Sequence, residues 1–205
     1  MIVIIDYATG NVGSIANMVK KIGAEAIISS SVKDIEMAEK LILPGVGAFD
    51  EGINNLQNSG LMSAITHKVF HDETPILGIC LGMQLFTKKS EEGISAGLGW
   101  IDAETIKFNF NNVVGNKLNI PHMGWNNIKS VQNNSLLEGI EPDSRFYFVH
   151  SYHVSCGDSK NILSTTFYGY EFVSSIMEGN ILGVQFHPEK SHKFGMKLLN
   201  NFVRL

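Results

Sequence analysis

Cysteine is scarce in this sequence, which has only Cys80 and Cys156 among 205 residues. Small secreted domains are commonly held together by several disulfide bonds. So few cysteines exclude such a framework, although these two residues could pair with each other. A chain of this size with at most one disulfide is typical of a reducing compartment. We therefore expect the protein in the cytoplasm.

Long hydrophobic runs are also missing. The apolar stretch at residues 1–5 ends at Asp6 and has no basic residue before it, so it fits neither a secretion signal nor a membrane span. It is typical of a buried strand. We expect no membrane partner.

Positive charge is low, because 16 Lys and Arg residues stand against 20 Asp and Glu residues, giving a net charge of −4. Affinity for nucleic acid comes largely from Lys and Arg that neutralise phosphates, so no nucleic-acid partner is expected. The sequence also has no Walker loop, no dinucleotide fingerprint at residues 10–13 (GNVG), and no cluster of His and Cys with metal-ligand spacing. We expect no cofactor and no metal.

The chain does have a hydrophobic content of 44% over a length that suits one buried core, so we expect a single domain over residues 1–205. In the first half, short apolar runs at 2–6, 41–43 and 75–79 alternate with helical patterns. The clearest helix follows residue 11 and ends before Gly23, a typical C-terminal cap. This alternation predicts an α/β fold with a mostly parallel central sheet flanked by helices.

The pattern of the sequence changes near Trp100. Alternating, aromatic-rich segments such as 145–150 and 167–170 are separated by Asn and Gly, which favours antiparallel hairpins. Residues 184–186 predict a further strand that enters a loop, and an apolar stripe from residue 191 onward predicts a closing helix. We therefore expect a more antiparallel second half.

Residues 78–82 (GICLG) have the form of a nucleophile elbow with Cys80 at its tip. In such an elbow a strand turns sharply into a helix, and small residues on either side, here Gly78 and Gly82, avoid clashes at the turn. The helix N-terminus favours the thiolate, on which the reactivity of a cysteine depends. The alternative is that Cys80 is a small core residue, as many isolated cysteines are.

Residues 187–189 (HPE) follow the strand predicted at 184–186, and the proline presets the backbone around His187 and Glu189. A thiol that attacks an amide needs a base for its proton, an acid for the departing ammonia, and a carboxylate that holds the imidazole. His187 and Glu189 can fill these roles beside Cys80. Alternatively, they are a loop histidine and a solvated acid.

Attack on an amide also creates an oxyanion, which needs fixed hydrogen-bond donors. The backbone N–H of Leu81, the residue after the nucleophile, can supply one. Residues 44–47 (PGVG), at the end of another predicted strand, can supply a second from Gly47, because glycine lets a backbone N–H approach closely. A tight strand-to-helix turn would explain these glycines equally well.

Together these three segments resemble the class I glutamine amidotransferases, and the resemblance spans nearly the whole chain. It implies the family fold, which is flavodoxin-like, and a glutaminase whose Cys-His-Glu triad falls on Cys80, His187 and Glu189. It also implies that L-glutamine is bound by Gln84, Ser151 and Tyr152, with the oxyanion loop at residues 44–47.

Within this class the sequence looks most like the amidotransferase subunits of imidazole glycerol phosphate synthase, because three segments follow their pattern: residues 121–126 (PHMGWN), 147–152 (YFVHSY) and 185–191 (QFHPEKS). The resemblance implies a heterodimer with a separate (β/α)₈ synthase, which uses the ammonia to form imidazole glycerol phosphate and AICAR. Residues that match the docking surface of these subunits are Asn11, Met123, Trp125 and Lys190.

A separate partner also has a physical reason. Ammonia released into neutral water is mostly protonated and loses its nucleophilicity, so a synthetic acceptor must be reached through a dry passage, and the sequence has no motif for an acceptor site. Two features depart from the family pattern. Ala8 stands where the family commonly has glycine, and residues 108–119 are Asn-rich and look expanded.

Alternatives remain at this stage. Paralogous subunits that share the PHMGWN segment supply ammonia to synthases that modify nucleotide-linked sugars for surface polysaccharides. Trp125 could be a core or stacking aromatic. A more remote alternative is a non-catalytic binding module on the same fold, with Cys80 buried and inert.

Overall fold

The computed structural model describes residues 1–111 and 118–205. The helices are α1 Val12–Lys21, α2 Val32–Glu36, α3 Phe49–Asn58, α4 Met62–Phe70, α5 Leu81–Leu85 and α6 His192–Arg204, with 3₁₀ turns η1 Ser135–Leu137, η2 Ser159–Asn161 and η3 Pro188–Lys190. The strands are β1 Ile2–Ile5, β2 Ala26–Ser29, β3 Lys40–Gly45, β4 Ile76–Cys80, β5 Ala103–Lys107, β6 His122–Asn127, β7 Lys129–Ser130, β8 Arg145–His150, β9 Tyr152–Cys156, β10 Ile162–Tyr168, β11 Tyr170–Glu178 and β12 Ile181–Val184.

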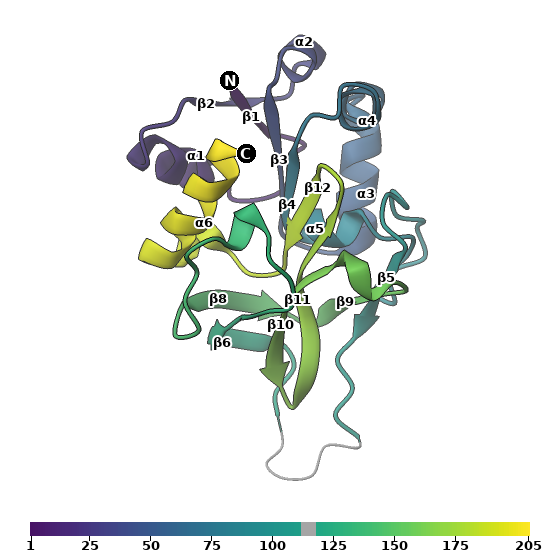
Figure 1. Ribbon diagram of the computed structural model, residues 1–205. Coiled ribbons are helices and arrows are strands. Elements are labelled where there is room, and N and C mark those ends of the chain that lie inside the picture. Colours follow the sequence, from purple (N-terminus) through teal and green to yellow (C-terminus); the bar gives the residue numbers. More distant parts are fainter. Residues whose placement is uncertain (112–117) are drawn as a thin grey trace.

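One sheet runs through both halves of the chain in the order β2-β1-β3-β4-β12-β11-β10-β7. Neighbouring strands from β2 to β12 are parallel, and those from β12 to β7 are antiparallel. Strand β9 pairs with β11 on one side and with β5 on the other, both antiparallel. Strands β6 and β8 form a separate antiparallel pair. Figure 1 shows the parallel strands with most of the helices in the upper part and the antiparallel strands below. The predicted α/β fold with a more antiparallel second half is confirmed.

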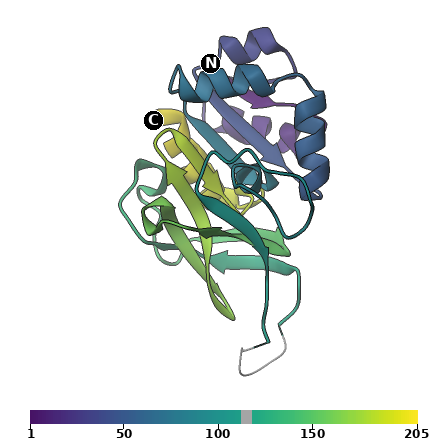
Figure 2. The same ribbon diagram turned by 90° about the vertical axis from the view of Figure 1, so that its right-hand side faces the viewer.

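Helices cover both faces of the parallel strands (Figures 1 and 2). Successive side chains of a strand point to opposite faces, so a strand buried on both sides is apolar throughout. In β1, Val3 and Ile5 pack into the core that also contains side chains of α2 to α5. Ile2 and Ile4 pack into the opposite core, with side chains of α1 and α6. This explains the unbroken apolar run at the start of the sequence.

The adjacent parallel strands β3, β4 and β12 all end at the same edge of the sheet. In the β3–β4 register Gly45 lies opposite Cys80, and in the β4–β12 register Val184 lies opposite Ile79. Because the carboxyl ends of parallel strands meet at one edge, the segments that follow β3 and β12 lie beside Cys80. The fold thereby brings together three segments that are far apart in the chain.

Most of the elements predicted from the sequence are present. Helix α1 ends as expected, because Gly23 has a φ of +81° and its N–H donates a hydrogen bond to the carbonyl of Lys20. The strand predicted at 184–186 is misplaced, since β12 runs from Ile181 to Val184. Its parallel partner β4 ends at Cys80, whereas on the other side the backbone N–H of Gln185 still donates to the carbonyl of Ser174 in β11.

The structure describes one of the two departures from the family pattern fully and the other in part. Ala8 has a φ of +65°, the left-handed conformation that glycine adopts most readily. The expanded Asn-rich stretch is described only at its two ends, because residues 112–117 lie outside the described residues. In the part of the chain that the structure describes, no helix combines the length and the hydrophobicity needed to cross a membrane.

Candidate active site

Cys80 lies at a strained turn between β4 and α5, with a φ of +55° and a ψ of −111°. Few residues other than glycine adopt a positive φ, and such strain concentrates at functional sites. A Cβ atom on Gly82 would lie 1.9 Å from the carbonyl oxygen of Leu43, and one on Gly78 would lie 2.7 Å from the backbone nitrogen of Met83. The prediction that small residues are required on both sides of the turn is confirmed.

Helix α5 has only five residues, so any stabilisation of a thiolate at Cys80 comes from the first backbone N–H groups more than from a long helix dipole. A side-chain donor adds to these groups. Nε2 of the fully buried Gln185 lies 3.7 Å from the Sγ atom of Cys80. A donor aimed at sulfur favours its negatively charged form.

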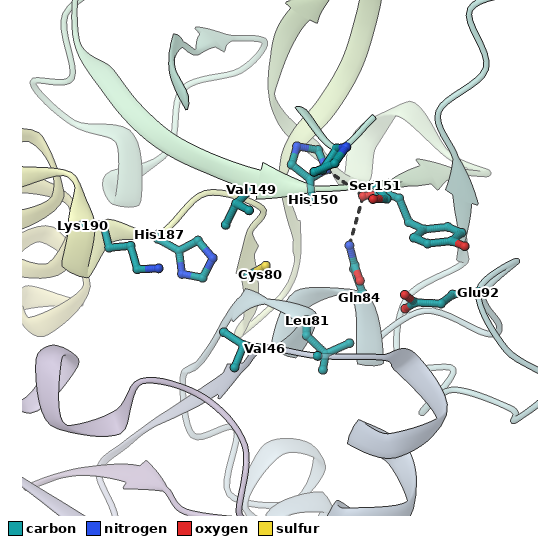
Figure 3. Close-up of a pocket in the computed structure, with 13 residues that line it drawn as sticks. Val46, Cys80, Leu81, Gln84, Glu92, Val149, His150, Ser151, His187 and Lys190 are labelled. Atoms are coloured by element: carbon teal, nitrogen blue, oxygen red, sulfur yellow. Dashed lines mark hydrogen bonds between the residues drawn. The ribbon is translucent and has the colours of Figure 1, made fainter. Parts of the chain in front are cut away.

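His187 is held in place through its backbone. Its N–H donates to the carbonyl of Tyr147 at 2.9 Å, and its own carbonyl accepts from the hydroxyl of Ser191 at 2.6 Å. That hydroxyl also accepts from the N–H of Tyr147 at 3.0 Å. The segment after β12 is therefore fixed to β8, and the imidazole is directed toward Cys80 (Figure 3).

The Nδ1 atom of His187 lies 2.7 Å from Oε1 of Glu189, and both side chains are almost completely buried. This contact requires a proton on Nδ1, so Nε2 is the atom left for chemistry. Nε2 is buried and bonds no atom of the described residues. An unpaired polar atom in the interior is costly, which points to a functional role for Nε2. Figure 3 shows the imidazole of His187 beside the sulfur of Cys80.

The pKa of His187 is raised above its ordinary value of 6.5. Burial alone lowers it, since desolvation disfavours the charged imidazolium, but the interactions with Cys80 and Glu189 are together stronger and favour the charged form. A thiolate beside an imidazolium is the reactive form of a cysteine nucleophile. Cys80 and Glu189 together therefore favour a protonated His187 beside the sulfur.

A cavity of about 320 Å³ opens in front of Cys80 and His187. It is lined by Val46, Gly47, Cys80, Leu81, Gln84, Glu92, Pro121, Val149, His150, Ser151, Tyr152, His187 and Lys190. The cavity wall thus brings together the predicted oxyanion donors, the predicted glutamine-binding residues and two members of the predicted triad, Cys80 and His187. Figure 3 shows these side chains converging from separate elements.

Gln84 is oriented by two hydrogen bonds. Its Nε2 atom donates to the carbonyl of Tyr152 at 3.1 Å and to Oε1 of Gln185 at 3.0 Å. Both protons of the amide are thereby used, and its oxygen is the polar atom that remains for a bound molecule. Glu92, also in the wall, accepts from the N–H of Phe49 at 2.9 Å.

Several residues of the site were not singled out from the sequence. Gln185 stands within the motif that contains His187, but only the structure shows its side chain on the sulfur. Glu92 lies in a loop with no motif, and its one sequence signal is a negative charge between turn residues. His150 belongs to the segment YFVHSY, in which only its neighbours had been assigned a role.

The residues expected at a docking surface lie in three places. Met123 and Trp125 on β6 are 62% and 44% exposed, so a core position for Trp125 is wrong. The other part of that alternative, a stacking aromatic, is confirmed, because Trp125 stacks on His192 with the rings 5.3 Å apart. Lys190 lines the cavity, with its Nζ 5.5 Å from the ring centre of Tyr147. Asn11 instead caps α1, where its side chain accepts from the N–H of Ser14.

Comparisons with known proteins give a consistent result. The family model "Glutamine amidotransferase class-I" matches residues 3–205. Imidazole glycerol phosphate synthase subunit HisH 2 of Methanococcus maripaludis is 57% identical over 204 residues, which cover 100% of this chain and 99% of that protein. Subunit HisH 2 of Pseudomonas aeruginosa is 49% identical and subunit HisH 1 of Campylobacter jejuni is 46% identical, each over the full length of both chains.

Solved structures with the same fold are more distant in sequence. A crystal structure of a glutamine amidotransferase has a TM-score of 0.71 at 19% identity and covers 98% of this chain and 97% of its own. The structure of PurLQS from Thermotoga maritima has a TM-score of 0.72 at 15% identity, with 99% and 97% covered. These likenesses extend over both the parallel and the antiparallel half of the fold.

Proposed function

The chain belongs to the class I glutamine amidotransferases, within the family of HisH subunits of imidazole glycerol phosphate synthase, and we propose that Cys80, His187 and Glu189 carry out its hydrolysis of L-glutamine. The observation that carries this proposal is the buried Nε2 of His187, which has no partner among the described residues and faces the sulfur of Cys80 at the cavity.

In the first half of the reaction, the thiolate of Cys80 attacks the side-chain carboxamide carbon of glutamine and forms a carbon–sulfur bond. The negative charge that develops on the carboxamide oxygen is stabilised by the backbone N–H groups of Leu81 and Gly47. The carbon–nitrogen bond then breaks while His187 gives its Nε2 proton to the nitrogen, which leaves as ammonia. A γ-glutamyl thioester remains on Cys80.

In the second half, water attacks the thioester and the now neutral His187 accepts one of its protons. The carbon–sulfur bond breaks, glutamate leaves, and the thiolate and imidazolium are restored. Glu189 holds the Nδ1–H of His187 through both steps, at the observed 2.7 Å, and so keeps Nε2 directed at the sulfur.

The cavity has a volume and polar groups that suit glutamine. The free side-chain oxygen of Gln84 is an acceptor for a substrate N–H, and the carboxylate of Glu92 complements the charge of an α-ammonium group. Ser151 and Tyr152 form the opposite part of the wall. Glutamine held between these groups reaches Cys80 with its carboxamide.

HisH is the glutamine-hydrolysing subunit of a complex with a cyclase subunit. We propose that this chain forms a heterodimer with a (β/α)₈ cyclase, which docks over Met123, Trp125 and Lys190, with Asn11 at the margin. Exposure of large apolar side chains beside the cavity supports this placement, because such side chains mark interaction sites. Ammonia would pass from the cavity to the cyclase, which forms imidazole glycerol phosphate and AICAR, in the cytoplasm.

The names of the relatives do not favour a role in surface polysaccharide synthesis. A non-catalytic module is not favoured either, since a strained Cys80 and an unpaired imidazole are costly to keep without chemistry.

The test is to measure glutamate and ammonia released from glutamine by the purified chain, alone and with the cyclase subunit and its ligand. We expect slow release by the chain alone and faster release in the loaded complex, with imidazole glycerol phosphate formed from glutamine. The absence of glutamate release under both conditions would refute the proposal.

A further inference from the structure

Two buried histidines outside the proposed triad form a pair at the wall of the cavity, which His150 lines and His122 backs. His122 on β6 and His150 on β8 lie opposite each other in the strand register, and both are almost fully buried. Nδ1 of His122 is 3.1 Å from Nε2 of His150. The hydrolysis described above uses neither of them, and a buried imidazole that merely filled space would be a costly choice.

The partners of these histidines decide where their protons are. Nδ1 of His150 lies 2.7 Å from the carbonyl oxygen of Tyr152, so it carries a proton and donates. Burial lowers the pKa of His150 to about 3 and that of His122 to about 4, which keeps both neutral near pH 7. Nε2 of His150 is therefore an acceptor, and Nδ1 of His122 donates to it.

The hydrogen bonds continue outward from His122. Its Nε2 is then an acceptor and lies 3.3 Å from Nδ2 of Asn126, which also donates to the carbonyl of Phe167 at 2.9 Å. Each ring nitrogen of His122 and His150 thus makes one hydrogen bond. In each of these bonds the donor lies on the β6 side and the acceptor on the side of the pocket. This consistency would be lost if either ring were turned over.

The hydrogen bonds also continue inward. The carbonyl of Tyr152 that accepts from His150 accepts from Gln84 as well, and Gln84 in turn donates to Gln185. Gln185 donates to the sulfur of Cys80. An unbroken series of polar contacts therefore connects Asn126 on β6 with the nucleophile.

Strand β6 shows what lies at the outer end of this series. Its side chains alternate between the two sides of the strand, so His122 and Asn126 face inward while Met123 and Trp125 are exposed. A partner that binds the exposed Met123 and Trp125 therefore contacts the same short strand that holds His122.

We infer that His122 and His150 are positioning residues for glutamine, which hold the Tyr152 carbonyl and hence Gln84 in place and transmit the docking of a partner on β6 to the pocket. The inference rests on the proposed function. It makes both histidines act through the Tyr152 carbonyl and Gln84, although His150 also lines the cavity, and it predicts an effect on glutamine binding more than on the chemical step.

Two amide substitutions at His122 test the role of a single donor. The side-chain nitrogen of an asparagine lies close to the position of Nδ1, whereas the longer glutamine places its amide near Nε2. His122→Asn therefore keeps the donor to His150, and His122→Gln removes it while keeping a polar side chain. Both variants lose the ring that stacks on Tyr168, so they are matched for packing.

For His122→Gln we expect the KM for glutamine to rise about fivefold to tenfold, with a smaller change in kcat and a weaker stimulation by the cyclase subunit. His122→Asn should stay within about threefold of the wild type in KM and keep the stimulation. Equal effects of the two substitutions, or a change in thermal stability alone, would show a structural role and overturn the inference.

A second measurement needs no variant and no activity. NMR of the ¹⁵N-labelled histidine rings of the wild-type chain reports which nitrogen is protonated. We expect His122 and His150 to carry their protons on Nδ1, and a proton on Nε2 of either ring would overturn the inference. A wild-type complex without glutaminase activity would instead refute the proposed function, so the two failures are distinguishable.

Discussion

Gln185 and Cys80, which are far apart in the sequence, are joined by a contact of 3.7 Å between the side-chain Nε2 and the sulfur. The same glutamine accepts from Gln84 at 3.0 Å, so it links the nucleophile to the pocket that receives the substrate. A donor on the sulfur stabilises the thiolate, because the side chain of Cys80 is itself only 8% exposed.

We expect Gln185→Leu to reduce kcat/KM for glutamine about 10-fold to 100-fold, because it removes a hydrogen bond to a charged atom. Gln185→Glu should reduce it further, since a carboxylate beside the sulfur opposes the thiolate. Steady-state kinetics of both variants, with circular dichroism to verify folding, checks this order. A Gln185→Leu variant with wild-type kcat/KM would remove this residue from the mechanism.

Cys80→Ser should lose glutaminase activity by at least about 10³-fold while the protein stays folded, because a hydroxyl is rarely ionised and is a much poorer nucleophile. Cys156→Ser is the matched control and should keep full activity. Glutamate release and thermal unfolding of the two variants provide the comparison. Substantial turnover by Cys80→Ser would contradict the assignment of the nucleophile.

Reactivity of the two thiols should differ strongly in the wild-type chain. Burial raises the pKa of Cys156 to about 12, with Asp102 and Asp158 adding to the effect, so its thiolate is rare at neutral pH. Cys80 opens on the cavity beside a raised-pKa imidazole. A glutamine-like electrophile should therefore label Cys80 first, and mass spectrometry of the labelled peptides tests it. Preferential labelling of Cys156 would be the contrary result.

Glu189→Gln should move the alkaline limb of the pH–rate profile to lower pH. The carboxylate is one of the groups that raise the pKa of His187, so replacing it with an amide lowers that pKa. Activity that depends on the imidazolium is lost as the pH rises through the pKa of His187, and the loss then begins earlier. The reduction of kcat near pH 7 should be milder than that of Cys80→Ser. An unchanged alkaline limb would show that Glu189 does not set the protonation of His187.

Ala8→Gly should stabilise the protein by about 0.5–1 kcal/mol. The φ of +65° at Ala8 costs about 1–2 kcal/mol for a residue with a Cβ, and the greater freedom of glycine in the unfolded chain offsets part of the gain. Chemical denaturation at equilibrium measures the difference in free energy of unfolding. A destabilised variant would mean that the Cβ of Ala8 makes contacts worth more than the strain.

Much of the site could be predicted from local sequence. Gly78 and Gly82 signal a turn too tight for a Cβ, and Cys80 between them has the position of a nucleophile. The tripeptide at 187–189 carries its own geometry, because the proline and the separation of two residues preset the contact of His187 with Glu189. Such signals survive in a single sequence because they depend on neighbouring residues only.

Other parts could not be predicted, because they depend on which strands become neighbours. The parallel pairing of β12 with β4 ends beside the turn at Cys80, a residue about a hundred positions away that no local pattern near Val184 reveals. The pairing of His122 with His150 arises from the register of β6 and β8, in which a shift of one residue would point both rings to the other side. Likewise, nothing near Glu92 in the sequence indicates that its loop reaches the cavity.

The sequence alone thus determined the α/β class, the elbow at Cys80 and the choice of Cys80, His187 and Glu189 as candidate reacting groups, since periodicity and steric limits act over a few residues. The tertiary structure decided that β3, β4 and β12 end side by side, that Gln185 reaches the sulfur, and that the His122–His150 pair lies between β6 and the pocket. These relationships follow from strand order and register, which are fixed only when the whole sheet buries its apolar faces together.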